Sequence, residues 1–165
     1  MTGKPPIAHI DELNLVSMSH GENFAAKIAR LGPVTGMRDL GCMLTVVPPG
    51  KKAFPRHNHH NIEEAFVILE GEGEYRFGDE THPVRAGHVL SAPIGGPETA
   101  HQLVNTGSSD LKYLAFSTMP AVDIVEYPDS GKIGAIRWSD PDADEPNFRH
   151  RAYLEDPVDY WEGEV

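Results

Sequence analysis

The stretch that decides the fold covers residues 50–71 and reads Gly50-Lys-Lys-Ala-Phe-Pro-Arg-His57-Asn-His59-His60-Asn-Ile-Glu63-Glu64-Ala-Phe-Val-Ile-Leu-Glu-Gly71. In an extended strand, side chains two residues apart point to the same face, so His57 and His59 can bind one metal ion together. Their Cα atoms would lie roughly 6.5 to 7 Å apart in such a strand. Glu64 opens the apolar run that follows and adds an anionic oxygen to the set.

A second stretch, residues 87–105, holds a fourth candidate ligand. It reads Gly87-His-Val-Leu-Ser-Ala-Pro93-Ile-Gly95-Gly-Pro-Glu-Thr-Ala-His101-Gln-Leu-Val-Asn105. His101 must return from a distant strand, which a closed β architecture does readily. Three imidazoles and one carboxylate suit Fe, Mn, Ni, Zn or Cu better than Mg or Ca. We therefore predict a metal site made of His57, His59, Glu64 and His101.

The two stretches resemble the paired sequence motifs of the cupin superfamily. The first motif is Gly, a short gap, His-x-His, three or four residues, Glu, six residues and Gly. The second motif is Gly, five residues, Pro-x-Gly, two residues, His, three residues and Asn. This chain departs from the usual spacing twice, because six residues separate Gly50 from His57 and five separate Gly95 from His101. His88 also stands where many cupins carry Asp.

The resemblance implies an all-β fold, the double-stranded β-helix or jelly roll of a cupin barrel, holding one divalent transition metal ion (Zn, Mn, Fe or Ni). The flanking segments further resemble small single-domain bacterial cupins that are labelled sugar-phosphate-isomerase-like; they read Val125-Glu-Tyr-Pro-Asp-Ser-Gly131 and Asp159-Tyr-Trp-Glu-Gly163. A metal-dependent sugar-phosphate isomerase is therefore implied, with catalytic residues unassigned. A non-haem metal dioxygenase and a small-molecule-binding cupin without catalysis are the alternatives.

Several neighbours of the four ligands compete for a role. Glu63 is a rival of Glu64, but strand alternation favours Glu64 because it shares its parity with Phe66 and Ile68. His60 has the opposite parity to His59, so we expect it to point outward or to support the site indirectly. We expect the polar residues after His101 to support the site or the backbone only; these are Gln102 and Asn105.

The chain is expected to form one domain. Residues 1–33 make an N-terminal arm, 34–118 the barrel core, and 119–165 a C-terminal extension that packs on the barrel or on a partner subunit. Apolar positions at helical spacing predict one short helix over residues 23–31, ended by Gly32-Pro33. Strands are predicted over 43–47, 64–69, 89–93, 101–105 and 112–117, with a hairpin of 74–77 and 81–85 and two edge strands over 122–127 and 132–137.

Composition excludes several classes of function. The formal net charge of −11 over 165 residues argues against a nucleic-acid partner. No stretch approaches the roughly 18 apolar residues of a membrane span, and residues 1–6 lack the apolar core of a secretory signal. The single cysteine, Cys42, cannot form an internal disulfide and is expected to be a buried hydrophobe, which is compatible with a cytoplasmic protein. We expect a homodimer that acts on a small-molecule substrate.

Three further features carry expectations. Residues 140–145 superficially match a calcium loop but are predicted to be a solvated acidic loop, because glutamate stands at the glycine position. Tyr160 and Trp161 are expected to dock the tail onto the barrel or a partner. Six basic residues could cradle a phosphate, although the parity of Arg56 points it away from the histidines; they are Lys51, Lys52, Arg56, Arg76, Arg85 and Lys112.

Overall fold

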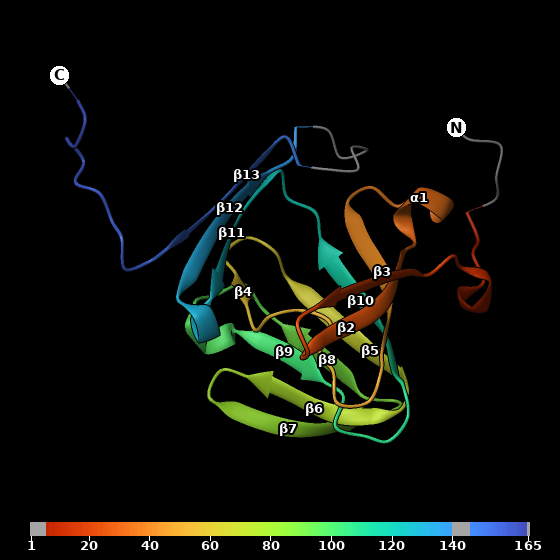
Figure 1. The fold of residues 1–165 in the computed structure, drawn as a ribbon. Coiled ribbons are helices and arrows are strands. Elements are labelled where there is room, and N and C mark those ends of the chain that lie inside the picture. The colour runs from red at the N-terminus through yellow and green to blue at the C-terminus, as the bar shows by residue number, and fades with distance from the viewer. Residues whose placement is uncertain (1–5, 140–145, 165) are drawn as a thin grey trace.

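The computed structural model describes residues 6–139 and 146–164, which are nearly all β (Figure 1). The strands are β1 (Val16–His20), β2 (Phe24–Arg30), β3 (Leu40–Val47), β4 (Asn58–His59), β5 (Glu64–Glu70), β6 (Glu72–Phe77), β7 (Glu80–Arg85), β8 (Val89–Ala92), β9 (His101–Val104), β10 (Leu111–Thr118), β11 (Val122–Tyr127), β12 (Lys132–Arg137) and β13 (Phe148–Tyr153). The short helices are η1 (Ile10–Glu12), α1 (Gly32–Thr35), η2 (Pro97–Thr99) and η3 (Pro128–Ser130). The predicted all-β class is confirmed.

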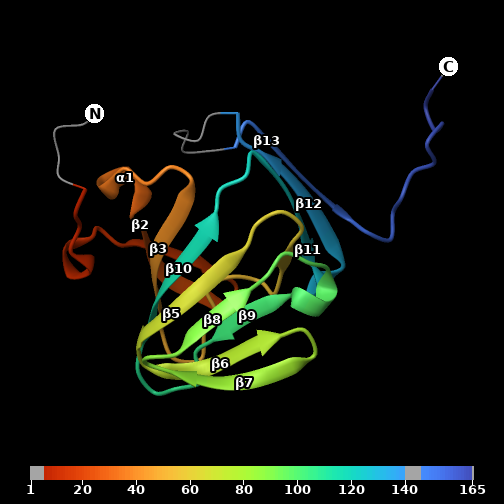
Figure 2. The same cartoon turned by 180° about the vertical axis from the view of Figure 1, so that it is seen from behind.

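The barrel is formed by two antiparallel sheets whose inner faces share one core. The six-stranded sheet has the order β1-β2-β3-β10-β5-β8, and the three-stranded sheet has the order β7-β6-β9. Figure 2 shows β5 and β8 lying next to β9, β6 and β7. The main cluster of buried side chains draws Phe66 and Ile68 from the first sheet and Tyr75 and Leu103 from the second. This closure brings segments that are far apart in the sequence to one end of the barrel.

Strand β5 is apolar on both faces because both faces are covered. Phe66 and Ile68 point into the main core and are 8% and 1% exposed. Leu69 packs on the other face in a second cluster that contains Leu31 and Cys42. That cluster is completed by Ile10 and Leu13 of the N-terminal segment, together with Met37, Leu114 and Phe116. The expected burial of Cys42 is confirmed, with an exposed fraction of 7%.

Gly71 ends β5 with a backbone conformation that other residues avoid. Its φ is +82°, in the left-handed region, and a Cβ at this position would overlap the carbonyl of Asp110. Glycine lacks that atom and adopts positive φ without penalty. The turn from β5 into β6 therefore requires the glycine that the first sequence motif places there.

The helix predicted over residues 23–31 is wrong. Residues 24–30 form β2, which pairs antiparallel with β1 on one side and with β3 on the other, where Lys27 faces Val46. A short run of alternating small and apolar residues does not distinguish a helix from a strand by itself, and the neighbouring strands decided the outcome. Gly32 and Pro33 begin the short helix α1 instead of ending a longer one. The N-terminal arm thus extends the barrel sheet.

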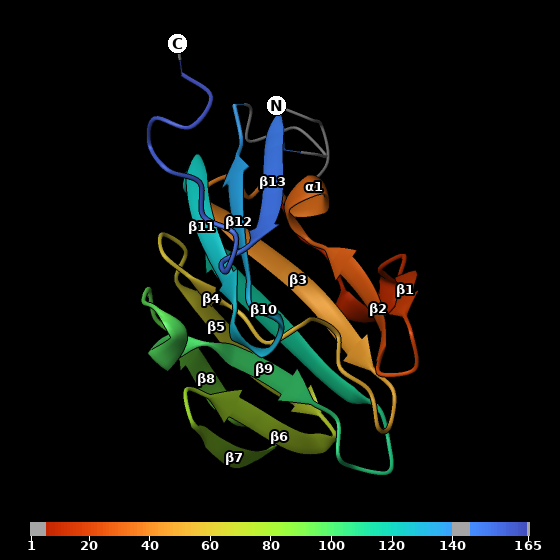
Figure 3. The same ribbon diagram turned by 60° about the vertical axis from the view of Figure 1, so that its left-hand side comes forward.

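The C-terminal extension forms a third sheet with the order β13-β12-β11-β4 (Figure 3). Strands β11 and β12 are confirmed, but neither lies at an edge, because β4 and the unpredicted β13 flank them. The ring centroids of Tyr160 and Trp161 lie 4.8 Å apart, and the two residues are 82% and 71% exposed. The prediction that they dock onto the barrel is therefore wrong. Docking onto a partner subunit stays a prediction. The acidic segment 140–145 and residues 1–5 lie outside the described residues.

Within residues 6–139 and 146–164, every helix falls short of the length and hydrophobicity that a membrane span requires.

Candidate metal centre

The four predicted ligands come from three separate parts of the barrel. His57 precedes the two-residue strand β4 and His59 ends it, Glu64 begins β5, and His101 begins β9. His57 and His101 form an isolated antiparallel bridge. The backbone N–H of His101 donates to the carbonyl of His57 at 2.8 Å, and the reverse bond is 3.2 Å long. Backbone pairing therefore fixes the distant histidine beside the His-x-His segment.

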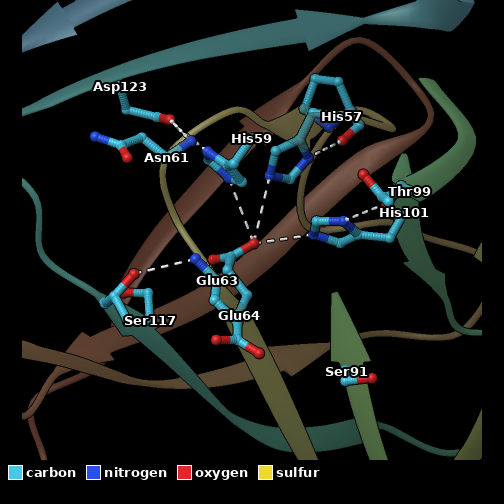
Figure 4. Close-up of polar contacts among 12 residues, drawn as sticks. His57, His59, Asn61, Glu63, Glu64, Ser91, Thr99, His101, Ser117 and Asp123 are labelled. Atoms are coloured by element: carbon cyan, nitrogen blue, oxygen red, sulfur yellow. Dashed lines mark hydrogen bonds and ion pairs between the residues drawn. The ribbon is translucent and has the colours of Figure 1, made fainter. Parts of the chain in front are cut away.

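Three imidazoles converge on one carboxylate oxygen (Figure 4). Glu64 Oε2 lies 2.9 Å from His101 Nε2, 3.4 Å from His59 Nε2 and 3.8 Å from His57 Nε2. The donor atoms of His57, His59 and Glu64 all lie within 4.8 Å of one another. The structure thus favours Glu64 over Glu63, whose backbone N–H donates to Thr118 Oγ1 at 3.0 Å.

The other ring nitrogen of each histidine faces an oxygen. His57 Nδ1 lies 2.8 Å from the Pro55 carbonyl, and His101 Nδ1 lies 3.3 Å from the Thr99 carbonyl. His59 Nδ1 lies 2.6 Å from Asp123 Oδ2. With a metal ion on the three Nε2 atoms, each Nδ1 would carry the proton and donate it to its oxygen, because carbonyl and carboxylate oxygens only accept hydrogen bonds. Metal-binding histidines have this orientation, with the outer nitrogen donating to an oxygen.

Burial and close neighbours shift the pKa values of His57, His59 and Glu64. Burial lowers the pKa of His57 to about 4, assisted by the neighbouring His101. Burial also acts to lower the pKa of His59, but its hydrogen bond with Asp123 and the negative charges of Glu64 and Asp123 outweigh burial and raise it to about 9. Burial would raise the pKa of Glu64, yet the hydrogen bond with His101 and the nearby imidazoles of His59 and His57 hold it well below its usual range. At neutral pH the metal-free site therefore contains an anionic Glu64 and a cationic His59.

One atom in the site lacks a hydrogen-bond partner. His59 Nε2 is buried, and although Glu64 Oε2 lies 3.4 Å away, no hydrogen bond of acceptable geometry reaches the nitrogen. A buried polar atom without a partner is unfavourable, and a cation among the three Nε2 atoms would satisfy it. The donor set of three nitrogens and one oxygen is suited to a transition metal. His57, His59 and Glu64 can therefore form a metal site, and His101 contacts the same carboxylate oxygen.

Asp123 is the residue that sequence analysis missed. It lies on β11, is 4% exposed, and accepts a second hydrogen bond from the backbone N–H of Asn61 at 3.0 Å. Residues 122–127 were expected to be only an edge strand. The available signal was parity, because Asp123 shares its face with Val125, which is 3% exposed and pairs with His59. A single carboxylate on the buried face of a strand requires a polar partner.

The supporting roles expected of neighbouring residues are confirmed. His60 is directed outward, with 42% of its side chain exposed and Nε2 3.5 Å from Glu126 Oε2. Gln102 donates from Nε2 to the Phe54 carbonyl at 2.8 Å. Asn105 donates from Nδ2 to the carbonyls of Val47 and Ser109 at 2.7 and 2.8 Å. Gln102 and Asn105 therefore hold the loops that connect the barrel strands.

Two of the six basic residues considered above lie together. Arg56 and Arg76 both contact Asp129 in η3, at 3.3 and 2.7 Å. Lys112 instead contacts Asp11 and Glu70, at 2.9 and 3.1 Å. The arginine pair is thus associated with the C-terminal sheet.

Comparison with known families agrees with this geometry. Residues 43–117 match the family described as "Cupin domain", and this segment contains all four converging side chains. Residues 43–117 are therefore similar to a cupin domain. The strands on either side of the domain, β1 and β2 before it and β11 to β13 after it, extend its sheets.

Curated relatives cover part of the chain. Auxin-binding protein 1 of Arabidopsis thaliana is 35% identical over 101 residues, which are 57% of this chain and 50% of that protein. Auxin-binding protein T85 of Nicotiana tabacum is 28% identical over 138 residues, 78% of this chain and 72% of that protein. The chain thus spans about half the length of the first of these relatives.

Solved structures share the fold over a greater length. A candidate sugar phosphate isomerase of Acidithiobacillus ferrooxidans has a TM-score of 0.77 at 24% identity, covering 90% of each chain. A sugar phosphate isomerase of Silicibacter pomeroyi from the cupin superfamily has a TM-score of 0.75 at 21% identity, covering 94% of this chain and 98% of that one. At these identities the similarity establishes the double-stranded β-helix fold.

Proposed function

We propose that the cupin domain binds one divalent transition metal ion (Zn, Mn, Fe or Ni) and acts as a metal-dependent isomerase on a sugar phosphate. The metal ligands in this proposal are His57, His59, Glu64 and His101. The observation that carries it is the common orientation of the three imidazoles, whose Nδ1 atoms face oxygens and whose Nε2 atoms face Glu64. This arrangement leaves His59 Nε2 buried without a partner, which a bound cation would correct.

The protein groups have separable roles in this function. Asp123 and the carbonyls of Pro55 and Thr99 orient the three rings, and Glu64 neutralises part of the charge of the ion. A bound ion would polarise a carbonyl or hydroxyl of the substrate as a Lewis acid. Four protein ligands leave coordination positions free for a small molecule, which distinguishes a working site from a closed structural one.

Support for sugar phosphates comes from fold similarity. The two structures that cover 90% and 94% of this chain are described as sugar phosphate isomerases. A phosphate dianion requires cationic or amide groups nearby, and the guanidinium of Arg56 is already engaged by Asp129 and the Gly78 carbonyl. The isomerase activity is supported by fold similarity, whereas metal binding is supported by the geometry of the site. Fold similarity is the weaker of these two supports.

The first experiment is elemental analysis of untagged protein purified without chelator, followed by loading with Zn, Mn, Fe and Ni. Stoichiometric metal is expected in the wild type and in the control variant His60→Ala, because His60 points away from Glu64. His57→Ala and His101→Ala are expected to lose it, and full occupancy in both variants would refute the site. Conversion of phosphorylated aldoses to ketoses by the loaded protein then tests the activity, and no turnover across hexose and pentose phosphates would refute the isomerase.

A second candidate function is binding of a small organic acid without turnover. It is favoured by the relatives named auxin-binding proteins, one of them 35% identical over 101 residues. Calorimetric titration of the metal-loaded protein with indole-3-acetate tests it, and saturable heat without any product supports it. Oxygen consumption by the iron-loaded protein with a candidate substrate would instead support a dioxygenase.

A further inference from the structure

Strands β11 and β12 form a hairpin that leaves the barrel after β10 and turns at η3 (Figure 3). The first strand of this hairpin lies against the metal-binding segment. Val125 pairs with His59, and the ring of Tyr127 stacks near the ring of His57 with a centroid distance of 6.2 Å and an interplanar angle of 29°. The tip of the hairpin therefore covers one side of the candidate metal centre.

The tip is held to the barrel by one carboxylate and two arginines. Arg76 of β6 donates to Asp129 through two nitrogens, Nη1 to Oδ2 at 2.7 Å and Nη2 to Oδ1 at 3.1 Å. Arg56 adds a third contact, from Nη1 to Oδ1 at 3.3 Å. The hydrogen bond from Arg76 lowers the pKa of Asp129 below its ordinary value, so the carboxylate is fully charged at neutral pH. A two-bond guanidinium–carboxylate contact is stronger and more directional than an ordinary surface ion pair.

Both arginines are themselves fixed to the barrel. Arg76 Nη1 also donates to Gln102 Oε1 at 2.8 Å, and Gln102 follows the ligand His101. Arg56 Nη2 donates to the Gly78 carbonyl at 2.5 Å. The arginines therefore present a preorganised receptor to the hairpin, and Asp129 is the group that leaves when the tip moves.

The root of the hairpin is attached differently. Asn61 contacts Asp123 and the carbonyl of Val122, and the backbone N–H of His60 donates to the carbonyl of Ile124 at 2.9 Å. These bonds, together with the pairing of Val125 and Glu126 with His59 and Asn58 in β4, hold β11 as far as Glu126, whereas the Asp129 contacts lie beyond its last residue. The hairpin can consequently open at its tip while its root stays in place.

We propose that the β11–β12 hairpin is a flap over the metal centre, and that Asp129 bound by Arg76 and Arg56 is the latch that keeps it closed. Opening at the tip moves Tyr127 away from His57 and exposes the metal-binding segment to small molecules. Asp129 is thus a positioning residue that touches none of the four ligands. The flap itself rests on the geometry above, and only its effect on metal exchange rests on the proposed function.

Hydrogen–deuterium exchange of the metal-free protein tests the latch directly. Asp129→Asn removes the charge and retains the shape, and it is expected to raise exchange of residues 127–133 roughly fivefold or more. Exchange in β3 and β10 should stay unchanged, as should all exchange in the control Asp156→Asn, where the same substitution is made on the exposed tail. Unchanged exchange at the hairpin, or an equal rise across β3 and β10, would overturn the proposal.

Two further measurements complete the test. Exchange of the wild type should rise at the same residues in about 1 M salt, where charges are screened beyond roughly 3 Å. This measurement needs no variant, so it tests the latch even if Asp129→Asn folds poorly. The rate at which a chelator removes Zn from the loaded protein should rise in Asp129→Asn by a similar factor, and an unchanged rate would overturn the gating role. If no metal binds to the wild type, the proposed function fails while the exchange data still decide the latch.

Discussion

Asp123→Asn separates two effects that the Asp123 carboxylate has on metal binding. The carboxylate orients His59 through the 2.6 Å contact with Nδ1, and loss of such an outer partner reduces metal affinity roughly 10- to 100-fold. It also contributes to raising the pKa of His59 to about 9, so a metal ion must displace a proton below that pH. The first effect favours binding by the wild type at every pH, and the second opposes it at neutral pH.

The magnitudes predict a crossing dependence on pH. At pH 7.5 displacement of the His59 proton weakens binding by about 30-fold, or roughly 2 kcal/mol, because the pH lies about 1.5 units below the pKa. Asp123→Asn removes the part of this competition that comes from Asp123, while Glu64 still raises the pKa of His59, so the two affinities should differ less at about pH 7.5 than above about pH 9. Above pH 9 competition disappears in both proteins, and the variant should bind roughly 10- to 100-fold more weakly.

The assay measures competition for Zn with a chromophoric chelator at four pH values between about 6.5 and 9.5. This range covers the ordinary pKa of a histidine, about 6.5, and the raised pKa of His59, about 9. The wild-type affinity should rise about tenfold per pH unit up to pH 9 from the His59 proton, and the variant affinity should rise much less. Glu126→Gln is the matched control, because Glu126 is another carboxylate of β11 that contacts Asn58 and His60 rather than a ligand. Parallel pH profiles for wild type and Asp123→Asn would refute the role assigned to Asp123.

Three further predictions concern stability and assembly. Gly71→Ala should lower the free energy of unfolding by about 2–4 kcal/mol in urea melts, because the φ of +82° is strained for alanine and its Cβ would overlap Asp110. The metal-free protein should lose thermal stability between pH 6.5 and 9, since the raised pKa of His59 stabilises the fold only while the imidazole is protonated; below pH 6.5 that contribution is complete. Removal of residues 155–165 should convert the expected homodimer to a monomer in light scattering, because this tail carries the exposed Tyr160 and Trp161.

Each of these predictions has a control. Gly87→Ala, with a φ of +92° but no atom within 4 Å of the added Cβ, should cost only about 1–2 kcal/mol, and equal losses would show that the overlap at Gly71 is unimportant. The pH-dependent loss should be smaller in Asp123→Asn, where only Glu64 still raises the pKa of His59, and an unchanged loss would assign it to another group. A wild type that is monomeric at micromolar concentration would contradict the dimer.

The sequence alone predicted four side chains that the structure brings together, and it determined the class of fold. His57 and His59, two residues apart, predicted a shared target, and the structure brings both rings to Glu64 Oε2. Alternation along residues 64–69 favoured Glu64 over Glu63, and the paired motifs identified His101 as the distant partner. These inferences succeeded because strand periodicity is a local property, which side-chain spacing records directly.

Sequence reasoning was less reliable where local preference competed with pairing. Residues 24–30 have apolar spacing compatible with a helix, yet they form β2 because β1 and β3 lie on both sides to complete its hydrogen bonds. The intrinsic preferences of such residues differ by less than about 1 kcal/mol each, so neighbouring strands outweigh them. The position of β12 between β11 and β13 likewise depended on a strand that local patterning did not reveal.

Only the tertiary structure decided which residues surround the ligands. Asp123 reaches His59 across 64 residues of sequence, and Asp129 reaches Arg76 across 53. Strand parity marks Asp123 as buried, but nothing local names its partner, and Asp129 carries no mark among the 25 acidic residues of this chain. Their roles arise from the closure of the third sheet onto the barrel, because a hydrogen bond requires two groups within about 3 Å and the folded backbone alone sets that distance.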